Sequence, residues 1–353
     1  MNTYSMLDVI KLLYPVLLFF KNRYFPDGKS FYSDEVIIEM MKGNRKVAPF
    51  IVPYANGIPQ KNAGYKAFKY TAPYIGTSSI ITARDLKQKA FGEDPNSNRS
   101  PADRLDELET ERTDELRNSV LRTMELMCTE LLQTGKITVK QYASAEDVGT
   151  SNFVLEDIQF FEDTFQNQYI PTKLWSAMTV SERLATLYAM ARILKTRGVT
   201  ATDVVLGANV STSLFSDPNF LKFYDFNKVN MGEIDAKVVP EGVTCNGTVN
   251  VNGILMTFFT YDEKYETLAG STASFIPEDA ILMIQPNMGV TPYGEVTFIK
   301  NENEAESIAE PLVPRIITNE KDNKITVEMY SRPLPYPKNP EGWLYYDTTT
   351  VSE

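Results

Sequence analysis

The chain has 353 residues, of which 43% are hydrophobic, so it can hold two domains, or one domain with large insertions, around a packed core. Its formal net charge is −11 and it has no block of basic residues, which argues against a surface that neutralises phosphate groups. It contains no histidine, which removes the commonest general base and metal ligand and every Ser-His or Cys-His nucleophile pair. We therefore expect no catalytic residue, no cofactor and no metal site.

Two patterns that resemble redox or metal sites fail on their spacing. Cys128 and Cys245 are far apart and form no Cys-x-x-Cys, so we expect two reduced and mostly buried thiols. Residues 94–98 alternate Asp and Asn as a calcium loop does, but Arg99 stands where the sharp turn needs glycine. Leu105 then stands where a bidentate carboxylate is required, so calcium binding is not predicted.

The first stretch with a clear pattern is an apolar run from Val9 to Phe20. Lys11 and Pro15 interrupt it, no basic leader precedes it, and it is shorter than the roughly 20 apolar residues that span a bilayer. We expect an amphipathic arm that docks on a folded surface, which can belong to another subunit. The residues expected to dock are Leu12, Leu13, Leu17, Leu18, Phe19 and Phe20. A turn at 26–28 and a strand at 36–38 follow.

From Val47 to Ile81 the chain consists of short apolar pieces broken by Pro and Gly, a texture that predicts a long excursion like a β-hairpin. It holds too many aromatic residues for a solvated loop, so we expect it to cover a surface. These aromatic residues are Phe50, Tyr54, Tyr65, Phe68, Tyr70 and Tyr74. Three lysines near its tip are interpreted as solubilising charges and not as a phosphate site.

The strongest local signals define a long helix between Ser100 and Gly135. Ser100 is a cap, Pro101 fits the first helical position, Asp103 completes a capping box and Gly135 ends the helix. An apolar stripe at steps of three or four is interrupted only by Arg112. Charged residues fill the other faces of the first half only, so the helix is expected to begin in water and end buried. An ordinary core helix or a coiled coil gives the same pattern.

Elements after this helix predict an α+β arrangement. Two alternating strands are expected at 137–142 and 153–158, and a second helix at 179–196 with Thr179 and Glu182 as a capping box. A strand at 203–207, two Asn-Gly hairpin turns at 246–247 and 252–253, and strands at 254–260 and 280–284 follow. We expect one compact domain from about Tyr169 to Phe298.

The last part of the chain predicts a closing hairpin and a tail. Strands at 315–318 and 324–330 flank a polar turn, and the pair is expected to rejoin the long helix. The proline-rich segment from Pro333 to Trp343 is expected to be extended.

The order of these elements, together with several motifs, resembles the lambda-type phage major capsid proteins, the major capsid protein E family, which have the Hong Kong 97 capsid fold. The motifs are Leu17-Leu-Phe-Phe20 leading into 31–38, Val47-Ala-Pro-Phe-Ile-Val-Pro53, Phe275-Ile-Pro-Glu-Asp before a strand, and Ser331-Arg-Pro-Leu334 after the closing hairpin. The resemblance implies an arm at 1–46, an extended loop at 47–90 and a peripheral domain with a spine helix at 91–168. It also implies an axial domain at 169–299 and a return to the peripheral domain with a tail at 300–353.

The same resemblance implies a structural role. The chain would assemble with itself into hexamers and pentamers of an icosahedral head that encloses double-stranded DNA without sequence-specific binding, aided by scaffold, portal and decoration proteins. It would be a virion protein assembled in the bacterial host cytoplasm, with no membrane partner and no enzymatic activity. An acidic wall suits a DNA container because it does not trap the polymer. The candidates for contact between subunits are Phe19, Phe20, Phe50, Tyr54, Tyr65, Phe68, Tyr70 and Tyr74.

Two alternatives stay open at this stage. An encapsulin-like bacterial shell protein shares the fold but holds cargo. A hydrolase would have to use a carboxylate pair, as glycosidases do. Its candidates are Asp157, Glu162, Asp163, Asp262 and Glu263, in runs that are also typical of solvated faces.

Overall fold

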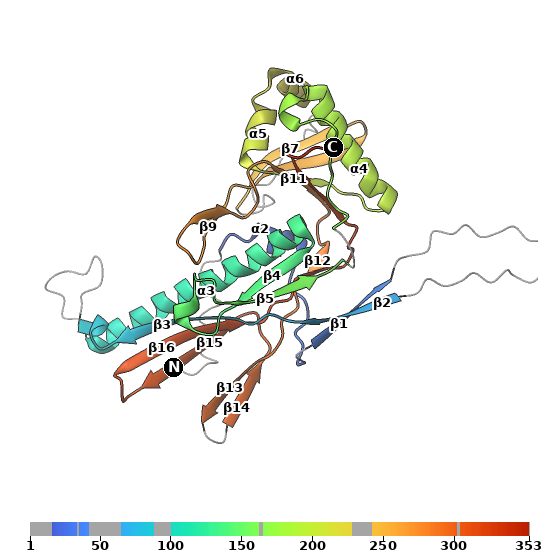
Figure 1. Ribbon diagram of the computed structural model, residues 1–353. Helices are drawn as coiled ribbons and strands as arrows, with labels where there is room; N and C mark the ends of the chain where they lie inside the picture. The colour runs from blue at the N-terminus through green and yellow to red at the C-terminus, as the bar shows by residue number, and fades with distance from the viewer. Residues whose placement is uncertain are drawn as a thin grey trace, which may run out of the picture.

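The computed structural model describes residues 16–33, 35–41, 65–87, 100–161, 165–227, 242–301 and 304–352. Figure 1 shows an upper and a lower part, with α2 and one end of α3 between them. The upper part is a five-stranded sheet covered by helices, and the lower part is a long helix lying on a three-stranded sheet. Hairpins project from both parts, which gives the molecule an extended outline with several arms.

The long helix α3 spans Pro101–Thr134, and the sequence-based prediction of it is confirmed. Ser100 Oγ accepts a hydrogen bond from Asp103 N at 3.2 Å while Asp103 Oδ2 accepts one from Ser100 N at 3.2 Å, so both members of the capping box are in place. Gly135 ends the helix at φ 75°, a left-handed conformation that an ordinary residue rarely adopts. The buried residues begin at Thr113, so the helix starts exposed and ends in the core, as expected.

The lower sheet has the order β15-β16-β3, with both strand pairs antiparallel. Its strands are β15 Val313–Asn319, β16 Lys324–Ser331 and β3 Ile75–Thr82. The α3 residues Leu116, Val120 and Met124 pack on Val327 and Met329 of β16. The predicted closing hairpin and its return to the long helix are thus confirmed.

The upper sheet has the order β18-β11-β6-β8-β7, in which only β6 and β8 are parallel. Its strands are β18 Trp343–Asp347, β11 Ala280–Ile284, β6 Asp203–Leu206, β8 Ile254–Thr260 and β7 Thr244–Val251. Ile281 and Met283 of β11 face one core cluster, while Leu282 and Ile284 face another. Because both faces of the sheet are covered, its central strands are continuous apolar runs.

Three helices cover one face of the upper sheet (Figure 1). They are α4 Val180–Arg197, α5 Ala208–Phe215 and α6 Pro218–Asn227. The predicted capping box of Thr179 and Glu182 is formed at the start of α4, and Gly198 ends that helix at φ 85°. The other face of the sheet packs on the buried end of α3.

The end of the chain differs from the sequence-based expectation of an extended tail that belongs to the lower part. Residues 336–337 form the short strand β17, which pairs with β12 Gly289–Val290. The chain then returns to the upper part, where β18 pairs with β11 from Ala280↔Asp347 to Ile284↔Trp343. Trp343 is fully buried and donates its indole N–H to Leu132 O at 2.8 Å, so the tail ties the upper sheet to α3.

One of the two predicted Asn-Gly turns is a turn and the other is not. Asn252 (φ 50°) and Gly253 (φ 86°) form the two-residue hairpin between β7 and β8. Gly247 (φ 100°) instead lies inside β7, where the pairing register shifts between Cys245 and Gly247. The unpaired residue of this β-bulge is Asn246, and the glycine beside it permits the positive φ that the bulge needs.

Four further antiparallel strand pairs lie outside the two main sheets. They are β1 Glu35–Met41 with β2 Tyr65–Thr71, β4 Lys136–Gln141 with β5 Val154–Gln159, β9 Lys264–Glu266 with β10 Thr272–Ser274, and β13 Val296–Asn301 with β14 Glu304–Ile308. The short helices are α2 Phe19–Tyr24, η1 Asp85–Lys87, η2 Ala145–Asp147 and η3 Trp175–Ala177. The pair β4 and β5 confirms the two strands predicted after the long helix.

The predicted excursion has a different base from the one expected. The ladder, by which we mean β1 and β2, starts at Glu35↔Thr71 and reaches Met41↔Tyr65, so its first strand begins before Val47. Residues 75–82 form β3 and belong to the lower sheet and not to the excursion. Residues 42–64 and the rejected calcium motif at 94–98 lie outside the described residues. None of the helices that the structure describes is long and apolar enough to cross a membrane.

Candidate subunit interface

The middle of the molecule is a junction formed by α2 between α3 and the upper sheet. Glu125 of α3 is almost fully buried, and its carboxylate accepts hydrogen bonds from the backbone N–H groups of Phe20 at 2.8 Å and Lys21 at 2.9 Å. It also accepts one at 3.1 Å from the hydroxyl of Tyr261, which follows β8. Burial raises the pKa of Glu125 to about 7, although these three donors lower it. One carboxylate thus holds three segments together.

A second buried carboxylate holds the other side of α2. Asp203, at the start of β6, is 1% exposed and lies 2.5 Å from Arg23 Nε. The hydroxyl of Tyr24 donates to the same oxygen at 3.0 Å, and burial beside this carboxylate raises the pKa of Tyr24. Consecutive residues of α2 therefore bind the long helix on one side and the upper sheet on the other.

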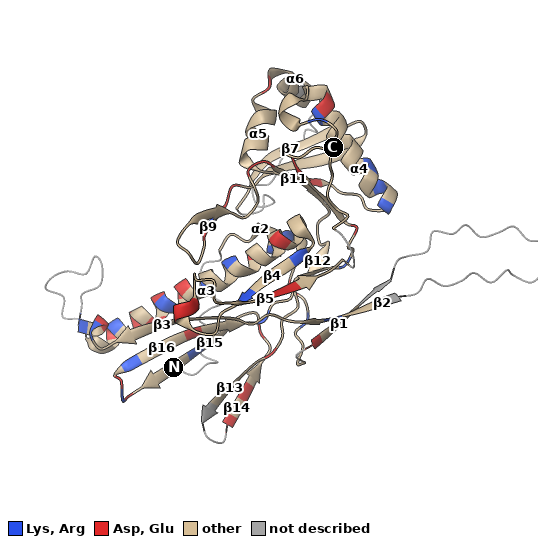
Figure 2. Ribbon diagram, in the orientation of Figure 1, with Lys and Arg blue, Asp and Glu red and all other residues tan. Residues whose placement is uncertain are grey.

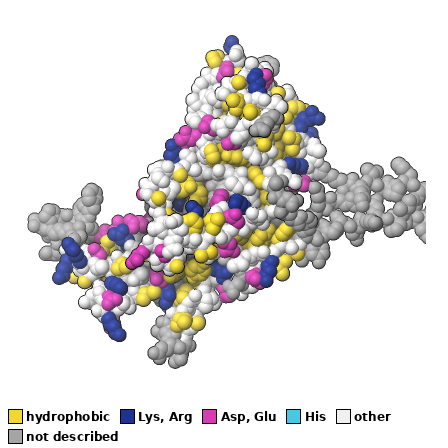
Figure 3. Space-filling view, in the orientation of Figure 1, with side chains coloured by type: hydrophobic (Ala, Val, Ile, Leu, Met, Phe, Trp, Pro, Cys, Tyr) yellow, Lys and Arg dark blue, Asp and Glu magenta, His cyan; other side chains and the backbone are white. Residues whose placement is uncertain are grey.

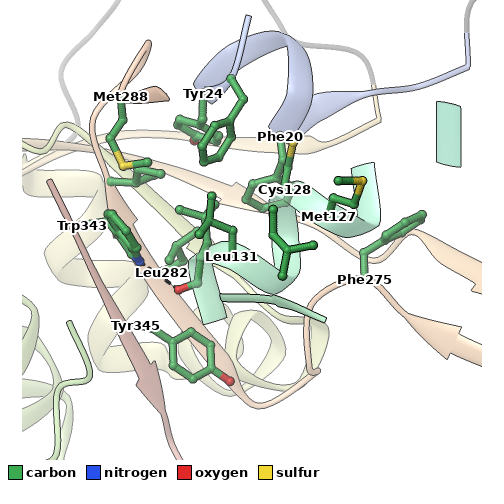
Figure 4. Packing of buried hydrophobic residues seen from close by; sticks show 14 of the residues in the cluster. Phe20, Tyr24, Met127, Cys128, Leu131, Phe275, Leu282, Met288, Trp343 and Tyr345 are labelled. Carbon is green, nitrogen blue, oxygen red and sulfur yellow. Dashed lines mark hydrogen bonds between the residues drawn. The ribbon is translucent and has the colours of Figure 1, made fainter. Parts of the chain in front are cut away.

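Aromatic packing completes the junction (Figure 4). The ring of Phe20 meets Tyr261 edge to face at 5.0 Å, and Phe19 lies 5.5 Å from Phe259. Phe19 is 2% exposed and Phe20 is fully buried. The structure differs here from the sequence-based prediction: both rings pack inside their own subunit, so neither offers a surface to a neighbour.

The ladder extends away from the body (Figure 1) and has two unlike faces. On the inner face Ile38 is buried, and Tyr70 donates its hydroxyl to Gln159 O at 2.9 Å and packs on Phe160 at 5.0 Å. Burial raises the pKa of Tyr70 to about 12. On the outer face Ile37 is 65% exposed. Tyr70 therefore anchors the base of the ladder, and Ile37 faces solvent.

The other aromatic candidates are placed as follows. Phe68 is half-buried and stacks on Tyr70 at 6.2 Å, while Tyr74 is 52% exposed and lies 5.6 Å from the ring of Tyr330. The side chains of the remaining three, Phe50, Tyr54 and Tyr65, lie outside the described residues. Of the predicted contact residues that the structure describes, only Phe68 and Tyr74 keep substantial surface.

Large apolar side chains are exposed on most of the projecting elements, and sequence reasoning did not single them out. Each member of this set is more than half exposed: Tyr32, Ile37, Ile80, Val154, Leu155, Leu268 and Ile299. Single exposed apolar residues are normal on any protein, but most of these are spread over separate strands and hairpins, namely β1, β3, β5, the β9–β10 hairpin and β13. Figure 3 shows hydrophobic side chains distributed over several of the visible lobes. The sequence gives little indication of these exposed residues, because an apolar residue in an alternating strand has the same pattern whether its side chain is exposed or buried.

The strand β3 adds a second kind of incomplete surface. It is an edge of the lower sheet, and no described strand pairs with its outer side. Its sequence from Ile75 to Thr82 contains no charge and no proline, the devices that usually protect an edge strand from pairing with another chain. The opposite edge, β15, carries Pro314 and Arg315. Among the described residues, the β3 edge thus lacks the usual protection against pairing with another strand.

The carboxylates proposed for a hydrolase do not form a catalytic pair in the described structure. Asp157 lies 2.6 Å from Lys136 Nζ, and this hydrogen bond lowers the pKa of Asp157, the opposite of what a general acid needs. Asp262 and Glu263 follow β8 in the upper part, and Glu162 and Asp163 lie outside the described residues. Within the described ranges no three Cys, Asp or Glu residues are placed to hold a metal ion.

A depression of about 550 Å³ lies between α5, the start of α4 and the end of β18. Arg183 lines it, but its guanidinium donates to the backbone oxygens of Trp175 at 3.3 Å and Ser213 at 2.9 Å. The one cation at this depression is thus occupied in holding two segments together.

The fold is that of phage capsid proteins of the Hong Kong 97 type. The putative capsid protein of a prophage of Escherichia coli CFT073 has the same fold, with a TM-score of 0.70 at 15% identity over 100% of this chain and 99% of that one. A subunit of the mature capsid of bacteriophage PhiM1 gives a TM-score of 0.54 at 10% identity, over 95% and 88% of the two chains. A phage-related protein of Bordetella bronchiseptica RB50 gives 0.52 at 10% identity, over 99% and 98%.

The chain belongs to the phage major capsid protein E family, whose model matches residues 2–346. The predicted fold and the predicted family are confirmed, and the family is one of structural proteins and not of enzymes. The match favours the phage capsid over the encapsulin-like alternative. No curated protein sequence matches this chain.

Proposed function

We propose that this chain is the subunit that builds the icosahedral head of a bacteriophage, as hexamers and pentamers that enclose double-stranded DNA. The observation that carries the proposal is the family match over residues 2–346. The distribution of buried and exposed surface supports it, because the inner core is complete while the arms keep apolar side chains exposed. A shell subunit needs such surfaces, since lateral contacts with neighbours supply the burial that the monomer lacks.

In this assembly the parts of the chain take different roles. Of the arm at 1–46, α2 belongs to the core of its own subunit, and of the extended loop at 47–90, β3 belongs to the lower sheet. The outer face of the ladder and the segment between its strands, 42–64, lie over a neighbour. Residues 91–168 and the return from 300 form the peripheral domain around the spine helix. Residues 169–299 form the axial domain near the capsomer centre, to which we add β18 because it pairs with β11. Phe50, Tyr54, Tyr65, Phe68 and Tyr74 of the loop, joined by Ile37, contact the next subunit, and Tyr70 anchors the loop to its own subunit.

The DNA inside is enclosed and not gripped. A formal net charge of −11 gives the inner wall no general attraction for phosphate groups, so the polymer stays mobile while it is packed. Assembly takes place in the bacterial host cytoplasm with scaffold and portal proteins, and decoration proteins bind the finished shell.

The test compares the full chain with a variant in which residues 42–64 are replaced by Asn-Gly. Met41 and Tyr65 are register partners, so a two-residue type I′ turn can close the ladder without shifting its strands. Negative-stain microscopy of the full chain is expected to show rings or closed shells. The shortened variant is expected to melt cooperatively within a few degrees of the full chain and to form no closed shell. A full chain that stays monomeric with and without scaffold would refute the proposed function, and normal shells from the variant would refute the role of the loop.

A further inference from the structure

The two ends of the upper sheet differ in the elements that lie there. The strand β6 runs from Asp203 to Leu206, and the end of α4 leads directly into its start. The parallel strand β8 leads out at the other end, toward β9 and β10. The last turn of α4 and the β9–β10 hairpin therefore lie at opposite ends of the strands, on opposite flanks of the molecule in Figure 1.

The flank at the end of α4 is basic. From residue 183 to residue 202 the chain carries four cations and no carboxylate, and Figure 2 marks the positions of basic residues along the ribbon of α4. Arg192 and Lys195 are exposed, and neither has an ion-pair partner among the described residues. Arg197 donates to Asn167 Oδ1 at 2.7 Å. An exposed aliphatic residue, Ile193, lies beside the two free cations.

The flank at the β9–β10 hairpin is acidic. Asp262 and Glu266 are exposed, and neither is ion-paired within the described part of the chain; Glu263 lies between them in sequence. The single cation of this segment, Lys264, lies 3.2 Å from Glu278 and is thus neutralised locally. Acidic side chains gather on the flank opposite α4 in Figure 3. Leu268, at the tip of the hairpin, is 67% exposed.

We infer that the basic flank of one copy binds the acidic flank of the next copy around the capsomer. The inference rests on the proposed function and adds which surfaces meet. Two different flanks that meet head to tail make a heterologous contact, and such a contact closes into a ring when its rotation is right. Opposite charges fix which flanks meet and in which direction, and the exposed aliphatic residues beside the charges supply apolar contact.

The helix dipole accounts for only part of this pattern. Lys195 lies in the last turn of α4, where any helix favours a cation. Arg192 lies more than one turn before the end of α4, and the dipole of α4 has no bearing on the carboxylates at the far end of the sheet. A contact between copies accounts for both flanks together.

The experiment reverses each flank alone and then both flanks in one chain. The basic-flank variant is Arg192→Glu with Lys195→Glu, the acidic-flank variant is Asp262→Lys with Glu266→Lys, and the combined variant carries all four changes. Lys222→Glu, an exposed charge reversal on α6, is the matched control. Circular dichroism melts confirm that each variant folds. Sedimentation and microscopy then measure the fraction of subunits in rings and shells.

Each single-flank variant is expected to lose assembly by about tenfold at low salt, since like charges then face each other at every contact. The combined variant is expected to assemble to within about twofold of the full chain. At about 0.5 M salt the differences in assembly between the variants are expected to become smaller, because exposed charges are screened. Single-flank variants that assemble like the full chain, or a combined variant no better than either, would overturn the inference and leave the proposed function intact. A full chain that forms no rings would overturn both.

Discussion

The junction around α2 and the ladder of β1 and β2 are neighbours in sequence, and both carry apolar runs. The apolar side chains of the junction are buried within the subunit, whereas one face of the ladder stays exposed. In the junction every polar partner is internal: Glu125 and Asp203 are buried and take hydrogen bonds from α2 and from Tyr261. In the ladder only the inner face is internal, and Ile37 on the outer face stays in solvent. The sequence alone predicted both regions to be contact surfaces.

The junction is needed for the subunit to fold, whereas the outer face of the ladder is free to take part in assembly. A buried carboxylate that accepts backbone N–H groups cannot be released cheaply, because the donors and the charge would each be left without partners in a dry core. The junction therefore fixes how the upper and lower parts are oriented in the monomer. The outer face of the ladder has no such constraint, so its contacts can form late, when a neighbour arrives.

The largest effect is expected from Phe20→Ala in the junction. The ring is fully buried among Phe19, Tyr24 and Tyr261, so its removal leaves a cavity and should lower the free energy of unfolding by about 3–5 kcal/mol. Chemical denaturation measures the change. Tyr32→Ala, at a position that is 71% exposed, is the control and should change stability by less than about 0.5 kcal/mol. Similar small effects for both would show that Phe20 does not belong to the folded core.

A smaller loss of stability is expected from Glu125→Gln. The amide keeps the size of the side chain, but its NH₂ group would face Phe20 N or Lys21 N, so one donor loses its acceptor at a cost of about 1–3 kcal/mol. Glu111→Gln, on the exposed part of the same helix, should be neutral.

The loss of stability caused by Glu125→Gln is expected to depend on pH. The folded-state pKa of Glu125 is about 7, above the ordinary 4.5, so the folded protein binds this proton more tightly than the unfolded chain does. Its contribution to stability is complete below about pH 4.5 and is lost as pH rises through about 7. The stability difference between the natural chain and Glu125→Gln should therefore be larger at pH 5 than at about pH 8. A difference that is constant with pH would contradict a titrating Glu125.

Ser100→Ala is expected to lower the free energy of unfolding by about 1 kcal/mol, because it removes the N-cap side chain of the capping box at the exposed start of α3. Ser119→Ala, exposed within the same helix, is the matched control and should be neutral or slightly stabilising, since alanine is the better helix former. A thermal melt of each variant gives the comparison. Equal melts would mean that the first turn of α3 frays in the natural chain.

These cases show which features the sequence makes predictable. The ends of α3 and α4 were predicted because a capping box and a following glycine are local signals. The place of β18 was not predicted, since pairing of Trp343 with Ile284 depends on a contact that is distant along the chain. The sequence also does not tell whose core an apolar run such as 17–20 enters. For the proposed interface, the family resemblance indicated the extended loop at 47–90. The exposed side chains of Ile37 and Leu268 needed the structure, because alternation alone does not separate an exposed face from a covered one.

The smallest effect on stability is expected from Ile37→Ser. This variant tests whether the outer face of the ladder contacts a neighbouring subunit. Ile37 and Ile38 are successive residues of β1 on opposite faces, 65% and 7% exposed, so one strand supplies both the test and its control. Ile38→Ser should lower the free energy of unfolding by about 2–4 kcal/mol, because it removes buried apolar volume and adds a hydroxyl to the core. Ile37→Ser should change it by less than about 0.5 kcal/mol, since its side chain is already in water.

Assembly should show the opposite order for Ile37→Ser. If the outer face of the ladder meets a neighbour, this variant removes apolar area from that contact, and microscopy should show folded subunits that form fewer closed shells than the natural chain. Leu221→Ala, which removes an exposed apolar side chain on α6 outside the ladder, is the control for assembly. Normal shells from Ile37→Ser, with a normal melt, would show that the outer face stays in solvent in the capsid. The contact made by the loop would then have to come from residues 42–64 together with Tyr65, Phe68 and Tyr74.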